Sequence, residues 1–195
     1  MSKLKDIWEM INSAISPKQD EVLSSAIELI KAMPNTTGED KADMCYAAGY
    51  AAYSMTTRNP RREEAESWLL EALTNAPGHL GSVLYIGYLA IDRKDWRTAA
   101  SVLFANPIES KNSVLIDRFV EARVYCLVRL ENWNMAFRHL RWFDNRMVED
   151  PNCGIILINF LRLLDENSNG TKFPECAKPI FEKIRWITEY KHWHE

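Results

Sequence analysis

The sequence has little glycine and little proline. Its 195 residues include seven Gly and eight Pro, whereas an all-β sandwich needs frequent tight turns and long linkers are rich in both residues. We therefore expect neither a β-sandwich nor an extended linker. Hydrophobic residues make up 47% and charged residues 26% of the chain, as in ordinary globular proteins, and the length suffices for one sizeable core.

The chain also lacks an excess of positive charge. Its net charge is −3 and its pI is about 5.9. Proteins that read nucleic acid normally carry a clear cationic excess, because neutralising phosphates dominates their affinity. An RNA-binding protein is therefore only an alternative interpretation, and nucleic acid is not a favoured partner.

Signals for export, membrane insertion and disulfide bonding are missing as well. No apolar segment follows Met1 as in a secretory signal peptide, and no stretch approaches the ~20 apolar residues of a membrane span. The cysteines contain no C-x-x-C pair and favour free, buried thiols in a reducing compartment. They are Cys45, Cys126, Cys153 and Cys176. We expect a cytoplasmic protein without a membrane partner.

No motif indicates a chemical reaction. The sequence has no H-E-x-x-H, no G-x-S-x-G and no glycine-rich phosphate loop. Paired carboxylates such as Glu63 and Glu64 lie at a predicted helix start, where they favour the helix dipole. His192 and His194 are only a weak signal for a metal site and are typical of a polar chain end. We predict no catalytic, cofactor-binding or metal-binding residue, with an enzyme on a helical scaffold as an alternative.

Helical periodicity runs through nearly the whole chain. Leu4, Ile7, Trp8 and Ile11, for example, form an i, i+3, i+4, i+7 stripe. Proline, glycine and asparagine separate one periodic segment from the next. The pattern predicts no strand and ten helices, at about 4–15, 17–33, 39–55, 60–75, 79–92, 96–104, 114–130, 133–147, 153–164 and 174–190.

Small and aromatic residues recur about every 34 residues between Ala65 and Trp133. Recurrence at fixed offsets on paired helices marks a helical solenoid, in which each hairpin stacks on the next. We predict an all-α fold, an α-α superhelix of about five antiparallel hairpins in a single domain over 1–195. Divergent hairpins at 1–38 and 149–195 flank central repeats at 39–148. The recurring sets are Ala65, Leu69, Ala72 and Pro77; then Gly87, Ala90, Trp96, Ala99 and Leu103; then Trp133, Ala136 and Leu140.

The segment from Leu80 to Ser113 resembles a tetratricopeptide repeat (TPR) of 34 residues. With Leu80 as position 1, Gly87 and Ala99 fall at positions 8 and 20, where the family has Gly and Ala. Small residues at these positions let the two helices of a hairpin cross closely. The resemblance covers about residues 42–145, and generic antiparallel hairpins give a similar signal. In the preceding unit Gly49 and Ala65 occupy the two positions, with an insertion of about four residues between them.

The resemblance implies a concave face lined by positions 2, 5, 9, 12 and 13 of each first helix, where the family binds protein or peptide partners. Tyrosine recurs at position 9 as Tyr50, Tyr88 and Tyr125. Such a ladder suits a protein-binding groove, because tyrosine offers a large apolar ring with a hydroxyl group. Packing between helices explains the ladder equally well. The candidate partner-binding residues are Tyr46, Tyr50, Tyr53, Tyr88, Asp92, Arg118, Tyr125 and Arg129.

The predicted function is therefore a non-catalytic module that binds a protein or peptide. Size and fold suggest a dedicated bacterial chaperone, immunity protein or adaptor by analogy. Some family members clamp a C-terminal carboxylate with Lys and Asn, which are Tyr and Leu here, so that ligand is not expected. Arg138, Arg141 and Arg146 fit either an acidic partner or a solvated helix face. Neither the partner's identity nor the oligomeric state follows from the sequence.

Overall fold

The computed structural model describes residues 2–15, 17–56, 58–105, 107–108, 113–132, 134–136 and 138–139. In these ranges every regular element is an α-helix and no strand is present. The chain divides into two compact units, Met1–Asp95 and Trp96–Glu195. Unit 1 holds α1 (Ser2–Ser13), α2 (Gln19–Lys31), α3 (Gly38–Ser54), α4 (Arg58–Asn75) and α5 (Leu80–Asp92). Unit 2 holds α6 (Trp96–Phe104) and α7 (Ser113–Arg129).

The first seven predicted helices are confirmed, with ends within about two residues of the predicted ones. Residues 134–136 and 138–139 are helical, as expected of the eighth. The ninth and tenth lie outside the described residues, and the single domain over 1–195 stays a prediction. None of the helices that the structure describes is both long and apolar enough to cross a bilayer.

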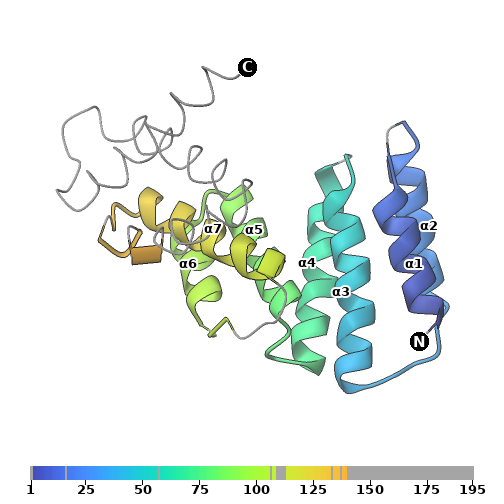
Figure 1. Ribbon diagram of the computed structural model, residues 1–195. Helices are drawn as coiled ribbons and strands as arrows, with labels where there is room; N and C mark the ends of the chain where they lie inside the picture. Colours follow the sequence, from blue (N-terminus) through green and yellow to red (C-terminus); the bar gives the residue numbers. More distant parts are fainter. Residues whose placement is uncertain are drawn as a thin grey trace, which may run out of the picture. The chain divides into compact units, whose positions relative to one another are not determined.

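Unit 1 is a stack of helices in which α3 is central. α3 contacts α1, α2, α4 and α5, and Figure 1 shows α1 to α4 side by side. A helix that packs on several sides has no single apolar stripe. Small side chains allow its neighbours to approach closely. The buried residues of α3 are Ala42, Met44, Cys45, Ala47, Ala48, Gly49, Ala51 and Ala52.

α3 and α4 approach each other closely at Gly49. A methyl group added there would lie 2.7 Å from Leu69 Cγ and 3.3 Å from the Ala65 carbonyl oxygen. Ala65 and Leu69 are fully buried. This contact confirms the expectation that small residues at positions 8 and 20 of the repeat mark the point where two helices cross.

Larger side chains of the first hairpin complete the core of unit 1. Ile7 and Ile11 of α1 and Leu23, Ile27 and Ile30 of α2 are buried against the alanines of α3. Hydrophobic residues at i, i+3, i+4 and i+7 turn one face of each helix toward this core. The first hairpin is thus held to the second by its apolar face.

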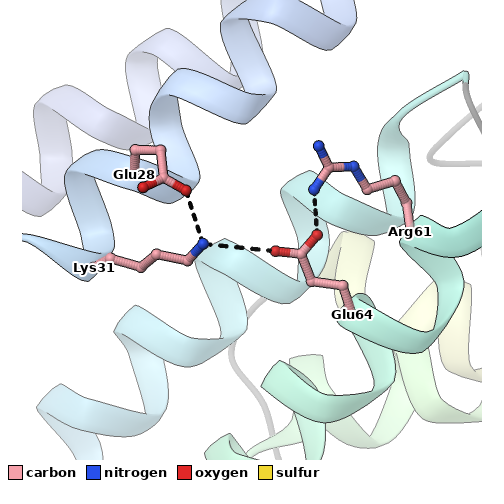
Figure 2. A network of polar contacts seen from close by, with 4 residues as sticks. All are labelled: Glu28, Lys31, Arg61 and Glu64. Atoms are coloured by element: carbon pink, nitrogen blue, oxygen red, sulfur yellow. Dashed lines mark hydrogen bonds and ion pairs between the residues drawn. The ribbon is translucent and has the colours of Figure 1, made fainter.

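A surface network of ion pairs also connects α2 with α4. The Lys31 ammonium lies 2.7 Å from the Glu28 carboxylate and 4.0 Å from that of Glu64, which also pairs with Arg61 (Figure 2). These side chains are partly exposed, so each pair contributes at most about 1 kcal/mol. The network favours the alignment of the two hairpins, while the buried core supplies most of the stabilisation.

Two helices end in the same way, 37 residues apart in sequence. Lys94 follows α5 with φ 61°, and Glu131 follows α7 with φ 57°. After α5, the Asp95 amide donates to the Ala90 carbonyl at 2.9 Å. After α7, the Asn132 amide donates to the Leu127 carbonyl at 2.8 Å. This is the Schellman arrangement, which normally places glycine in the left-handed conformation. The matching ends support the 37-residue spacing between Trp96 and Trp133.

Unit 2 contains a buried arginine that links its two described helices. Arg123 of α7 donates Nε and Nη2 to the Leu103 carbonyl at the end of α6, at 2.9 and 2.6 Å. Its guanidinium carbon lies 4.7 Å from the Phe104 ring centroid and 5.8 Å from that of Phe119. A helix C-terminus attracts positive charge, so this contact offsets part of the cost of burying the arginine.

Replacing Gly49 with Ala tests the crossing of α3 and α4. We expect Gly49→Ala to lower the free energy of unfolding by about 1–3 kcal/mol, because the new methyl group overlaps buried Leu69. Urea denaturation followed by far-UV circular dichroism measures the change. Gly78→Ala is the control, since a methyl group there meets nothing within 4 Å. Equal stability of both variants would contradict the close crossing.

Lys94→Gly tests the left-handed turn after α5. We expect it to raise the free energy of unfolding by about 1 kcal/mol, because glycine adopts a positive φ without the steric cost that a side chain carries. Lys94→Ala removes the charge but retains a Cβ atom, so its stability should stay near that of the natural chain. Thermal unfolding of the natural chain and of the two variants measures these differences. Equal gains in stability for both variants would exclude a backbone effect.

Candidate functional site

Six aromatic side chains of unit 1 form one continuous group, which we call the aromatic cluster. Neighbouring ring centroids lie 5.0 to 6.3 Å apart, most of them tilted or edge-on. These are favourable geometries for aromatic pairs. The cluster is shared by the first helices of the first two hairpins and by α5. Its members are Trp8 on α1, Tyr46, Tyr50 and Tyr53 on α3, and Tyr85 and Tyr88 on α5.

Helical spacing places these rings on common faces. Tyr46, Tyr50 and Tyr53 occupy i, i+4 and i+7 on α3, and Tyr85 and Tyr88 occupy i and i+3 on α5. Tyr85 is the centre of the cluster, with only 5% of its surface exposed. The other five rings are half-buried, so each retains a surface that another molecule can contact.

Tyr85 and Trp8 were missed among the candidate residues. Tyr85 contacts four tyrosines of the cluster, with centroid distances of 5.0 to 6.0 Å. It stands at position 6 of the repeat, which the family resemblance does not place on the concave face. Its spacing of three residues from Tyr88 was the available signal. Trp8 lies in the divergent first hairpin, where the repeat register is too weak to assign it.

His79 anchors one end of the aromatic cluster. Its ring lies 4.9 Å from that of Tyr46, and its Nε2 lies 3.2 Å from Asp43 Oδ1. Its Nδ1 accepts from the Ser82 amide at 3.1 Å, which caps the N-terminus of α5. Gly81 lies beneath the Tyr46 ring, since a methyl group there would lie 2.6 Å from Tyr46 Cζ. The start of α5 is thereby fixed beside the second turn of α3.

Arg62 and Asp92 form the other end. Arg62 of α4 reaches the cluster with its guanidinium carbon 3.9 Å from the centroid of the Tyr53 ring. Its Nη2 lies 2.8 Å from Asp92 Oδ2 on α5. Burial raises the pKa of the Tyr53 hydroxyl. Of its two charged neighbours, Arg62 lowers this pKa and Asp92 raises it. Arg62 Nη1 is buried and has no hydrogen-bond partner among the described residues.

The structure brings together five of the eight candidate residues. Tyr46, Tyr50, Tyr53, Tyr88 and Asp92 all belong to the aromatic cluster or its ends. Tyr50 and Tyr88 do not stand as separate rungs of a ladder, because both contact Tyr85. Part of the cluster therefore packs helices against one another, and the rings around Tyr85 are half-buried.

The other three candidates lie in unit 2. The ring centroid of Tyr125 lies 5.6 Å from that of Trp96, and Arg129 Nη2 donates to the Tyr125 hydroxyl at 3.3 Å. Arg118 is exposed on α7. Burial raises the pKa of Glu121, and the charge of Arg118 offsets part of this rise. A ladder running from Tyr88 to Tyr125 stays a prediction, and so does a shared concave face.

Two pockets of unit 1 lie apart from the six rings. One, of about 400 Å³, lies between α1 and α2 and is lined by apolar residues including Ile7, Met10 and Leu29. The other, of about 270 Å³, lies among α2, α3 and α4 and includes Lys41, Cys45 and Trp68. Within the described ranges no three His, Cys, Asp or Glu side chains are placed to hold a metal ion. His192, His194, Arg141 and Arg146 lie outside those ranges.

Solved structures of MamA share the fold of this chain. One MamA AMB-1 structure gives a TM-score of 0.56 at 18% identity, covering 94% of this chain and 96% of that one. A MamA MSR-1 structure gives 0.57 at 16% identity, covering 97% of each chain. No protein-family model matches the sequence, and neither does any curated protein. At these identities the likeness shows the fold alone. MamA is a TPR-like helical protein, so the predicted all-α, TPR-like superhelix is confirmed.

The thiols of Cys45 and Cys126 yield a testable expectation. Burial raises the pKa of Cys45 to about 11 and that of Cys126 to about 12. In a chain with Cys153→Ser and Cys176→Ser, we expect a thiol reagent at pH 8 to react about a hundredfold more slowly with the folded than with the unfolded protein.

The same thiols make stability depend on alkaline pH. Folding favours the protonated thiol, so this contribution is complete below the unfolded pKa of about 8.5 and is lost as the pH rises through about 11. Fast labelling of the folded chain at pH 8 would contradict the burial of both thiols.

Proposed function

We propose that this protein is a non-catalytic binding module that holds a protein or peptide partner on its aromatic cluster. The observation that carries the proposal is the exposure of five half-buried rings drawn from successive first helices of a TPR-like stack. Tyrosine and tryptophan are enriched where protein partners bind, because they offer large rigid contact areas at a low cost in entropy.

The packing inside the cluster supports this function. Tyr85 holds the surrounding rings in place from below, so a partner would not have to order them on binding. Preorganisation of this kind improves affinity without adding contacts. Tyrosine also carries a hydroxyl group, which suits it to contacts with a polypeptide backbone.

We propose that the protein binds one dedicated partner, as a chaperone, an immunity protein or an adaptor does. The chain carries one aromatic cluster in unit 1 and further candidates, Arg118, Tyr125 and Arg129, in unit 2. We propose Arg118, Tyr125 and Arg129 as further contacts for the partner. Buried free thiols at Cys45 and Cys126 suit a reducing compartment, so we propose the cytoplasm as the site of action.

Site-specific crosslinking tests where the partner binds. We expect benzoylphenylalanine at position 88 to form a discrete adduct with a second polypeptide in native host cells, because the replaced ring faces the bound partner. The control places the same group at position 70, since Leu70 on α4 is 51% exposed and outside the cluster. Adducts of equal yield at positions 88 and 70 would contradict the proposal. So would the absence of an adduct both at position 88 and with the same group at position 50.

With the partner captured, alanine substitution measures the contribution of one ring. We expect Tyr88→Ala to weaken binding by at least about tenfold, as for an aromatic hot spot, and Leu70→Ala to change it little. Far-UV circular dichroism of each variant separates loss of binding from loss of fold.

A further inference from the structure

The helices that carry the aromatic cluster are acidic. α1, α3 and α5 contain six carboxylates and three lysines. Two of the lysines are paired, Lys5 with Glu9 and Lys41 with Glu71 of α4. An acidic surface attracts cationic partners and repels anionic ones. The charge of these helices therefore points toward a basic partner.

Two partly exposed carboxylates flank the rings. Asp43 stands beside Tyr46 and His79, and its side chain is 56% exposed. Asp92 stands beside Tyr53 and Arg62, and its side chain is 40% exposed. A carboxylate accepts several hydrogen bonds, so each can bind a further cation while retaining its present partner.

The two carboxylates lie at opposite ends of the cluster. The N-terminal end of α5 meets the second turn of α3 through His79 and Asp43. The C-terminal end of α5 meets Tyr53, near the end of α3, through Arg62 and Asp92. α3 advances ten residues from Asp43 to Tyr53, which corresponds to about 15 Å along its axis.

Arg62 shows how this surface holds a guanidinium group. The group lies over the face of Tyr53 and pairs with Asp92 at 2.8 Å. A cation over an aromatic face gains about 0.5–2 kcal/mol, and a nearby carboxylate adds to the attraction. The half-buried rings beside Asp43 offer an incoming arginine or lysine the same combination of groups.

We infer that the aromatic cluster binds an extended basic peptide whose two cationic side chains are four residues apart. Side chains separated by an even number of residues point to the same side of an extended chain, and four residues span about 13 Å at about 3.3 Å per residue. Long arginine or lysine side chains cover the small difference from the ~15 Å along α3. One cation lies near Asp43 and the other near Asp92, with apolar or aromatic side chains between them on the rings. This inference rests on the proposed function and adds the chemistry of the partner.

Fluorescence anisotropy with short peptides tests the inference on the full chain. The probe is a labelled pentapeptide with Arg at both ends and Phe and Pro between, and its reference has Glu at both ends. We expect the basic peptide to bind at least about tenfold more tightly, because cations complement the flanking carboxylates. Tighter binding of the Glu peptide would overturn the inference.

Charge-neutral variants separate the flanking carboxylates from general acidity. The double variant Asp43→Asn, Asp92→Asn should weaken binding of the basic peptide at least about tenfold. The asparagine side chain still offers an oxygen that can accept a hydrogen bond from His79 or Arg62. If the double variant does not fold, Asp43→Asn alone is measured instead. Glu21→Gln with Glu28→Gln on α2 removes the same charge and should change binding less than about twofold. Equal losses in both pairs would overturn the inference.

The crosslinking result keeps the two proposals distinguishable. If neither peptide binds although position 88 still forms its specific adduct, the inference on charge is wrong and the binding function stands. If neither peptide binds and position 88 forms no adduct, both are wrong. Binding of the Arg peptide that is unchanged by Tyr50→Ala and Tyr88→Ala would also overturn the inference, because the rings would then take no part.

Discussion

The close crossing of α3 and α4 is the contact on which the rest of unit 1 depends. Gly49 lies against Leu69 and the backbone of Ala65, and a larger residue there would force the buried Leu69 side chain to move. This contact brings the backbones together and leaves the other sides of α3 for α1, α2 and α5. Because alanine fills the interior of α3, its tyrosines are confined to the face that it shares with α1 and α5.

The aromatic cluster follows from that arrangement. Three tyrosines on one face of α3 reach Trp8 on one side and Tyr85 on the other, so one continuous group of rings joins three helices. Polar contacts close both ends: His79 caps α5 beside Asp43, and Arg62 bridges Tyr53 and Asp92. Packing and binding are thus compatible roles, since the central ring is buried and the surrounding rings are half-exposed.

Sequence periodicity predicted the helices well because most of them present a regular apolar face, as Ile7 and Ile11 do in α1. It assigned the candidate site less completely. Tyr46, Tyr50, Tyr53 and Tyr88 were found by repeat position, but Tyr85 and Trp8 were not. Position in a repeat says which way a side chain points only where the register is strict, and the first hairpin departs from it. The likeness to MamA structures confirms the fold and leaves the partner to be identified.

The sequence by itself determined the all-helical class, the hairpin order and the close crossing, because these depend on local spacing and on the size of side chains at fixed offsets. Only the tertiary structure decided which rings meet and which charges flank them. Arg62, for example, lies thirty residues from Asp92 in sequence, yet the two pair at 2.8 Å over the Tyr53 ring. Such contacts depend on the angles and offsets between helices, which arise from packing over the whole unit and leave no local pattern in the chain.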